Sequence, residues 1–159
     1  MAVHKLIIDD FESADYTLIA IHSSLEDYRL AYFVNRELDI RLEKCKKDIG
    51  VKKEGDYVFF SRYNFEDPYQ DSAWNLIQNK NSITATQTGT GTFFADPDFA
   101  VSTSVLFIPE LKIADYVLKI DNSEMKDTAI VQQLLAVKHI ATAYKVDHYK
   151  LKSKNNLIF

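Results

Sequence analysis

The chain has 159 residues and a formal net charge of −4, and 47% of its residues are apolar and 26% charged. A chain of this length sustains one hydrophobic core without splitting, so we expect a single globular domain over residues 1–159. The acidic balance argues against a dedicated nucleic-acid binder, because such proteins neutralise phosphates with an excess of Lys and Arg.

Cysteine usage and hydropathy indicate the compartment. Cys45 is the single cysteine, which excludes an intramolecular disulfide and a Cys-rich metal site and fits a reducing cytoplasm. The first 16 residues lack the apolar core of a signal peptide, and no apolar run is long enough to span a bilayer. We therefore expect a cytoplasmic protein with no membrane segment.

The first third of the chain predicts two strands and a helix. Residues 3–8, with Leu6, Ile7 and Ile8 as their apolar part, predict a short strand, and residues 16–21, rich in β-branched and aromatic side chains, predict a second. Ser23 and Ser24, each followed three residues later by an acidic residue, predict the capped start of a helix over residues 25–38. Phe33 falls on the polar side of this helix, where either a partner or another element of the domain covers it.

Residues 40–65 predict strands around a turn. Residues 40–45 alternate in polarity and predict a strand near a sheet edge. Gly50 and Gly55 bracket a Lys-rich turn. Residues 57–65 are strongly aromatic on both faces and predict one strand that is central or covered on both sides.

The segment that follows predicts a hairpin and a polar connection. Residues 66–71 contain Pro68 and predict a turn, and residues 73–78 predict the returning strand. Residues 79–92 are polar and rich in Thr, which leaves two alternatives open, a β-ribbon or a mobile loop.

The last third predicts alternating strands and one helix. Strands are expected over residues 101–108 and 113–120, with Tyr116, Leu118 and Ile120 on one face of the second. A helix is expected over residues 126–137, with an apolar stripe of Ile130, Val131, Leu134, Leu135 and Val137. Residues 140–146 predict a strand, with a continued helix as the alternative, and residues 156–159 predict a final short strand.

These elements define an α+β fold. Two β-α-β units, over residues 16–45 and 113–147, flank an antiparallel middle, so we expect a mixed but largely antiparallel sheet with two main helices on one face. The second unit has the outline of half a ferredoxin-like or ACT-type fold, an analogy that says little about function.

Residues 108–116 read IPELKIADY and are the most specific string in the chain. The string resembles the signature of a bacterial family, the IPExxxVDY family, which is defined by this signature rather than by an activity. Ile108, Pro109, Glu110, Asp115 and Tyr116 match the pattern, and Ala114 stands where the family name has Val. The resemblance implies a bacterial protein and supplies no catalytic assignment.

The signature has two interpretations. In the structural one it is a strand, a turn at Pro109 and Glu110, and a second strand with Tyr116 packed inward. In the functional one Pro109, Glu110, Asp115 and Tyr116 form a recognition loop with acidic contacts, and Phe33 is a further binding candidate. Loss of partner binding in Glu110→Ala at unchanged melting temperature favours the second interpretation, and loss of both favours the first.

No pattern in the sequence predicts catalysis, a cofactor or a metal. The four histidines lack the spacing of a helical zinc site, and neither a nucleophile elbow nor a phosphate loop occurs. The acidic turns at residues 66–71 and 96–98 lack the full calcium-loop pattern, so local hydrogen bonding explains them better. His22 next to Ser23 is explained by helix capping rather than by nucleophile activation.

Three functions follow, in order of preference. The first is a non-catalytic module that binds another protein or itself, with a dimer formed through an edge strand as one version. The second is a sensor of an anionic small molecule near the second β-α-β unit, where Lys138, Lys145 and Lys150 would meet the ligand. The third is an enzyme that uses Glu110, Asp115 and Tyr116, which requires these groups to converge in one cleft.

Overall fold

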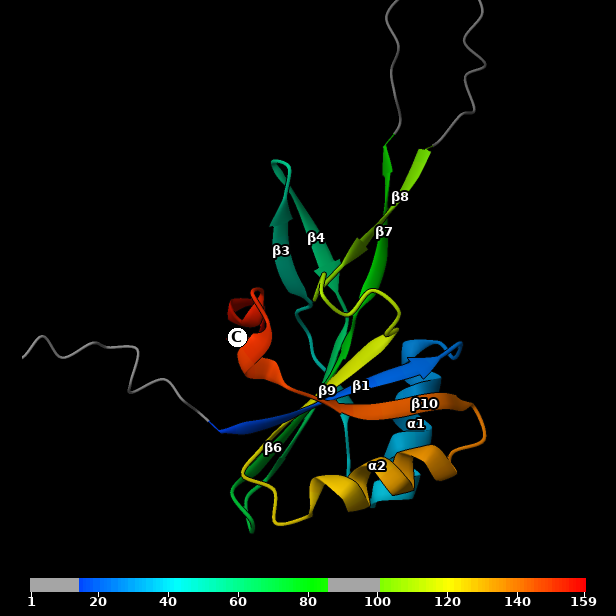
Figure 1. Cartoon of the computed structure of the whole chain (residues 1–159), viewed down its shortest axis with the longest axis vertical. Coiled ribbons are helices and arrows are strands. Elements are labelled where there is room, and N and C mark those ends of the chain that lie inside the picture. Colours follow the sequence, from blue (N-terminus) through cyan, green and yellow to red (C-terminus); the bar gives the residue numbers. More distant parts are fainter. Residues whose placement is uncertain (1–14, 86–100) are drawn as a thin grey trace, which may run out of the picture.

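A six-stranded sheet forms the centre of the computed structural model, which describes residues 15–85 and 101–159 (Figure 1). The strands lie in the order β10 (Ile140–Val146), β1 (Tyr16–Ser23), β9 (Tyr116–Asp121), β6 (Ser72–Gln78), β5 (Arg62–Asp67) and β2 (Glu43–Lys44). Every pairing in this order is antiparallel. The predicted α+β class and single domain architecture agree with this arrangement.

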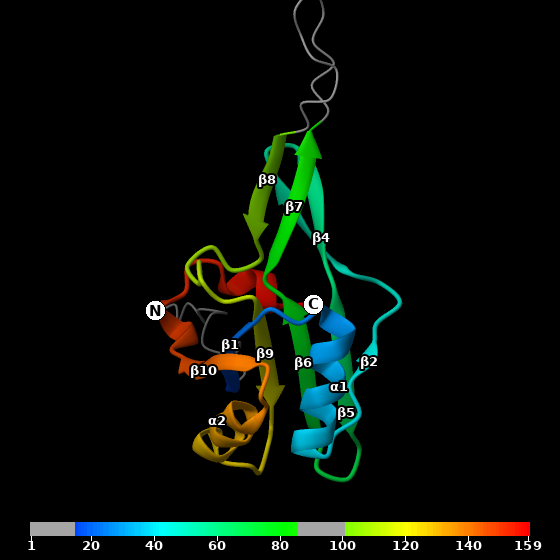
Figure 2. The same cartoon turned by 90° about the vertical axis from the view of Figure 1, so that its right-hand side faces the viewer.

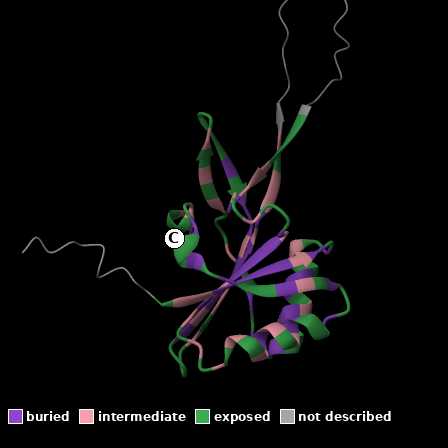
Figure 3. Cartoon of the chain, viewed as in Figure 1, coloured by how far each residue is buried: buried purple, intermediate pink, exposed green. Residues whose placement is uncertain are grey.

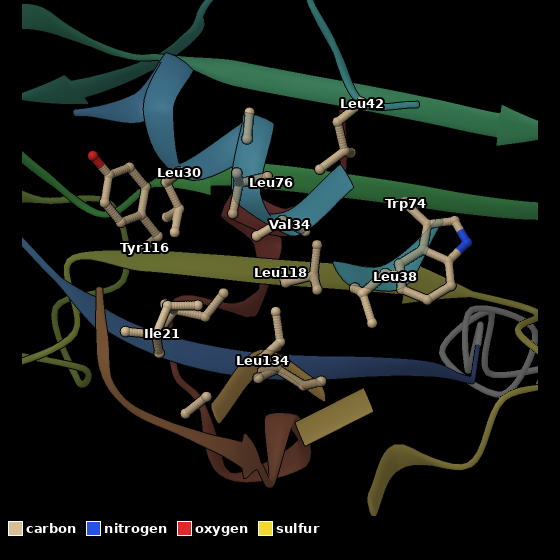
Figure 4. Close-up of a cluster of buried hydrophobic side chains, with 14 of the residues drawn as sticks. Ile21, Leu30, Val34, Leu38, Leu42, Trp74, Leu76, Tyr116, Leu118 and Leu134 are labelled. Atoms are coloured by element: carbon tan, nitrogen blue, oxygen red, sulfur yellow. The ribbon is translucent and has the colours of Figure 1, made fainter. Parts of the chain in front are cut away.

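Both helices pack on one face of the sheet, as expected (Figure 1). Helix α1 covers Asp27–Leu38 and helix α2 covers Asp127–Ala136. Their buried side chains and one face of the sheet form the helix-side core, which includes Ile21, Leu30, Val34, Leu118 and Leu134 (Figure 4). Neither helix of the described chain has the length and apolar character needed to cross a membrane.

The opposite face of the sheet carries a second core. This hairpin-side core contains Leu18, Ala20, Phe60, Ile77 and Phe107, all fully buried. Strand β1 therefore buries successive residues on alternate faces, which explains its continuous apolar sequence (Figure 3). Two short 3₁₀ turns, at His148–Lys150 and Lys154–Leu157, close this side and contribute Leu151 and Leu157.

Two hairpins extend from the sheet on this side (Figure 2). One pairs β3 (Ile49–Lys53) with β4 (Asp56–Phe60), and the other pairs β7 (Lys80–Ala85) with β8 (Val101–Leu106). The described part of residues 79–92 is thus a β-ribbon, and the remainder lies outside the described residues together with the expected strand at 3–8 and the acidic turn at 96–98.

The single strand expected over residues 57–65 is two strands, which corrects the prediction. The chain leaves the central sheet at Ser61, so β4 pairs with β3 while β5 pairs with β6 and β2. Side chains still alternate between the two faces across the break. The face that packs against the helices at Tyr63 has no helix over it at Tyr57 and Phe59. Those two rings are exposed, so this strand is not covered on both faces.

The second β-α-β unit is confirmed in outline. Strands β9 and β10 are both antiparallel to β1, which lies between them, so they run parallel to each other. Helix α2 connects them as a crossover, which is the split β-α-β arrangement of a ferredoxin-like half. The alternative of a continued helix over residues 140–146 is wrong. In the first unit, β1 and β2 lie far apart in the sheet.

Several element boundaries also differ from expectation. Helix α1 begins at Asp27 with Glu26 at its N-cap and no side-chain cap, while Ser23 Oγ binds the N–H of Leu25 and the carbonyl of His139. Residues 40–45 contribute only the two-residue edge strand β2. The Lys-rich turn is a hairpin that reverses at Glu54 and Gly55, and the last residues form a 3₁₀ turn rather than a strand.

Candidate functional site

The signature loop, residues 107–116, is organised around one buried side chain. Asn79 is 0% exposed. Its Oδ1 accepts the N–H of Ile108 at 2.8 Å, and its Nδ2 donates to the carbonyls of Leu111 and Ala114 at 2.9 and 2.8 Å. The backbone of Asn79 binds Phe107 and Asp115 as well. Because the loop backbone is buried here, these bonds replace those that a sheet would provide.

Glu110 connects the loop to the C-terminal segment. Its Oε1 accepts the N–H groups of Lys152 and Ser153 at 2.6 and 2.9 Å, and its Oε2 accepts the Ser153 hydroxyl at 2.6 Å. Partial burial raises the pKa of Glu110, but these hydrogen bonds outweigh burial and hold the pKa below its usual value. The expected turn is present, since Leu111 N–H binds the Ile108 carbonyl across Pro109 and Glu110.

Asp115 and Tyr116 point to different parts of the domain. Asp115 accepts the N–H of Ser23 at 2.9 Å and the Lys80 ammonium at 3.0 Å. Tyr116 lies in the helix-side core and donates its hydroxyl proton to the Leu25 carbonyl at 2.6 Å (Figure 4). Burial, followed by the nearby charges of Asp27 and Asp115, raises the pKa of Tyr116.

The structure does not bring the predicted site residues together. Asp115 and Tyr116 both bond to residues 23–25, whereas Glu110 bonds to residues 152–153, so Glu110 does not converge with the other two for acid–base chemistry. Phe33 is partly buried on the helix-side core with its ring 5.3 Å from the ring of His139. Another element of the domain therefore packs against Phe33, the second of the two alternatives.

One exposed surface was missed by the sequence analysis. The outer hairpin face consists of Gly50, Lys52, Tyr57 and Phe59, which share the side of the β3–β4 hairpin that points away from the hairpin-side core. Tyr57 is 62% and Phe59 55% exposed, and their rings stack at 6.4 Å. The alternation of Gly50 and Lys52 with apolar residues was the signal, since it predicts one uncovered face.

A cavity of about 520 Å³ opens where β1 begins and β9 and β10 end. We call it the sheet-end cavity. Its wall combines carboxylates, aromatic rings and small polar groups: Asp15, Tyr16, Thr17, Ile120, Asn122, Ser123, Asp127, Lys145, Asp147, His148 and Tyr149. These residues come from three distant stretches of the chain, 15–17, 120–127 and 145–149, so no local sequence pattern identified them.

Two lysines near this cavity form ion pairs with carboxylates. Lys145 binds Asp127 at 2.5 Å and Lys150 lies 3.3 Å from Asp147. The hydrogen bond from Lys145, with a further one from Thr17, lowers the pKa of Asp127 despite its partial burial. Lys138, the third lysine that was expected to bind an anionic ligand, does not line the cavity. The basic groups therefore do not converge on one anion site.

The other chemical candidates are held by contacts within the domain. Among residues 15–85 and 101–159 no three His, Cys, Asp or Glu side chains are grouped as metal ligands. Ser23 donates its hydroxyl proton to the His139 carbonyl, and His22 contacts the Tyr144 hydroxyl at 3.2 Å. Cys45 is half-buried, with its sulfur 3.4 Å from Asn64 Oδ1.

Comparisons with protein-family models, curated proteins and solved structures found no match to this chain. The geometry of its own residues is therefore the basis for assigning a function.

Proposed function

We propose that this protein is a non-catalytic interaction module that binds an acidic segment of a partner protein through the outer hairpin face. The observation that carries the proposal is the pair of exposed aromatic rings, Tyr57 and Phe59, on a hairpin that projects from the sheet (Figure 1). Aromatic side chains bury large areas and are enriched in the central parts of protein interfaces.

The backbone beneath the rings favours a fixed arrangement. Gly50 pairs with Phe59 across the hairpin, and a Cβ at Gly50 would lie 3.0 Å from Cε1 of the Phe59 ring. The missing side chain therefore leaves space for the ring to lie over the strand. A ring positioned in this way loses little conformational entropy when a partner covers it.

Exposed lysines before and on the hairpin favour an acidic partner, although the hairpin also carries Glu54 and Asp56. Lys46, Lys47 and Lys52 are exposed, and none forms an ion pair within the described chain. Lys44 is paired with Asp48, so it contributes less. Cations beside aromatic rings attract carboxylates over a distance of about one Debye length, roughly 8–10 Å in physiological salt.

Site-specific photocrosslinking in the native host cell tests this surface. A photoreactive residue at Phe59 should give a discrete adduct, while one at Tyr69, 97% exposed in the β5–β6 turn, should not. The captured protein should contain an acidic segment, and a synthetic peptide of that segment should bind the purified chain more weakly in Phe59→Ser than in Tyr69→Ser. Equal capture at both positions, or a basic captured segment, would refute the proposal.

Self-association through β10 is a second candidate. Strand β10 pairs only with β1 in the described chain, so half of its backbone groups face outward at the sheet edge. Pairing with β10 of a second copy would satisfy these groups. Light scattering should then show a dimer whose fraction increases with concentration, and Ala141→Pro should shift it to monomer. A monomer at all concentrations excludes this candidate.

We also propose a family and a cellular location for this protein. The string IPELKIADY supports membership of the IPExxxVDY family of bacterial proteins. A single cysteine, Cys45, supports a cytoplasmic location, because proteins of oxidising compartments commonly carry paired cysteines.

A further inference from the structure

His148 is an unusual residue in the wall of the sheet-end cavity. It is 8% exposed, its ring stacks on Tyr16 with the ring centroids 4.0 Å apart, and it is tilted against Tyr149 at 4.3 Å. Buried polar side chains normally find a hydrogen-bond partner. Neither ring nitrogen of His148 has a hydrogen-bond partner among the described residues, and the residue lines the cavity. The imidazole therefore offers an unused polar atom to the cavity.

The wall of the cavity carries more carboxylates than lysines, while Lys145 and Lys154 also act on the imidazole. Asp15, Asp127 and Asp147 line the cavity, whereas Lys145 is the one lysine in its wall. Lys145 is paired with Asp127 and Lys150 with Asp147, whereas Asp15 has no salt bridge among the described residues. A cavity with an excess of carboxylates concentrates cations and repels anions.

Burial favours the neutral form of the imidazole. Desolvation lowers the pKa of His148, although Asp15 and Asp147 oppose this effect. A neutral imidazole has one nitrogen that accepts a hydrogen bond and one that donates. Together with the carboxylates and the aromatic face of Tyr149, it provides acceptors and a cation–π surface for an N–H group that carries positive charge.

We propose that the sheet-end cavity binds a small organic cation, an amine or a guanidinium compound, between His148, Asp15, Asp147 and the ring of Tyr149. The volume of about 520 Å³ suits a small metabolite. A metal ion fits less well, because the described residues contain no group of three ligand side chains. An anion would face three carboxylates. This site is separate from the outer hairpin face, so it adds to the proposed interaction function.

Calorimetric titration of the full chain with putrescine, spermidine and arginine tests the site, with citrate as the anionic comparison. At least one of the cations should bind with a one-to-one stoichiometry, and citrate should not. His148→Phe keeps an aromatic ring in the stack and removes the nitrogen, and Asp147→Asn removes one charge. Each should weaken binding of that cation about tenfold, equivalent to about 1.4 kcal/mol.

Controls separate this result from unspecific charge effects. Glu66→Gln removes an exposed carboxylate on β5 that does not line the cavity, and it should leave the affinity unchanged. Thermal melting verifies that each variant is folded, and Asp147→Asn serves as the test if His148→Phe does not fold. Absence of binding by all three cations, equal binding of citrate, or equal affinity in the wild type and Asp147→Asn would overturn the proposal.

Discussion

The carboxylate of Glu110 binds Ser153 through both of its oxygens, with Oε1 on the backbone N–H at 2.9 Å and Oε2 on the hydroxyl at 2.6 Å. These two residues are 43 positions apart in the chain, so the contact fixes the C-terminal segment against the signature loop. The segment in turn contributes Leu157 to the hairpin-side core. Glu110 is thus an exposed residue with an intramolecular role.

Replacement of Glu110 by Gln should destabilise the protein. The variant loses the charge on a group that accepts three hydrogen bonds, and capping interactions of this kind contribute about 1 kcal/mol. For a chain of this length the melting temperature should fall by about 2–4 °C. Glu66→Gln, a change at an exposed carboxylate, is the control and should alter the melting temperature by less than about 1 °C.

The effect of Glu110→Gln should depend on pH. The folded-state pKa of Glu110 lies below its unfolded value, so its contribution is fully present above the unfolded pKa, about 4.3, and is lost as the pH falls through the folded pKa. The gap in melting temperature between wild type and variant should be constant near neutral pH and narrow below about pH 4. A gap that widens in acid would contradict this assignment.

Removal of the Asn79 side chain should have a larger effect. Asn79→Ala leaves the Ile108 N–H and the Leu111 and Ala114 carbonyls without their partner in a buried loop. Each unsatisfied group costs about 1–3 kcal/mol, so the free energy of unfolding should decrease by at least about 3 kcal/mol. Denaturant unfolding measures it, with the exposed Asn155→Ala as the matched variant. Similar losses in both would show that Asn79 does not organise the loop.

Adjacent leucines of α2 provide a test of the helix-side core. Leu134 is fully buried in that core, whereas Leu135 is exposed, although the sequence placed both on the apolar stripe. Leu134→Ala should destabilise the protein by about 2–5 kcal/mol because it opens a cavity. Leu135→Ala should change the free energy of unfolding by no more than about 0.5 kcal/mol. The reverse order would mean that α2 packs through a different face.

The turn of the β3–β4 hairpin depends on Gly55. Its φ is +96°, a value that residues with a Cβ rarely adopt. Gly55→Ala should therefore destabilise the hairpin by about 1 kcal/mol. Hydrogen exchange of the β3 and β4 amides should accelerate about fivefold, while Lys52→Ala in the same hairpin should leave it nearly unchanged. If these amides exchange at the same rate in both variants, the turn does not require a glycine.

The predicted IPELKIADY site is a junction in the fold rather than a cluster of side chains. The turn at Pro109 and the inward position of Tyr116 followed from local rules of turn chemistry and strand alternation. The partners of Glu110 and Asp115 did not, because Ser153, Ser23 and Lys80 come from distant segments. Contacts between distant segments depend on topology, which local patterns do not encode.

The sequence by itself determined the elements whose burial is regular. Composition over residues 16–21 and 140–146 predicted β1 and β10, because β-branched and aromatic side chains fit a pleated sheet. Periodicity over residues 126–137 predicted α2, because a buried helix face imposes its period on the residues that line it. Only the tertiary structure decided that residues 57–65 divide at Ser61 and that the sheet-end cavity gathers residues from 15–17, 120–127 and 145–149. The division at Ser61 depends on where one strand leaves the sheet, and the cavity depends on where other strands end. Alternation of polarity along a single strand does not reveal these positions, because it is the same before and after them.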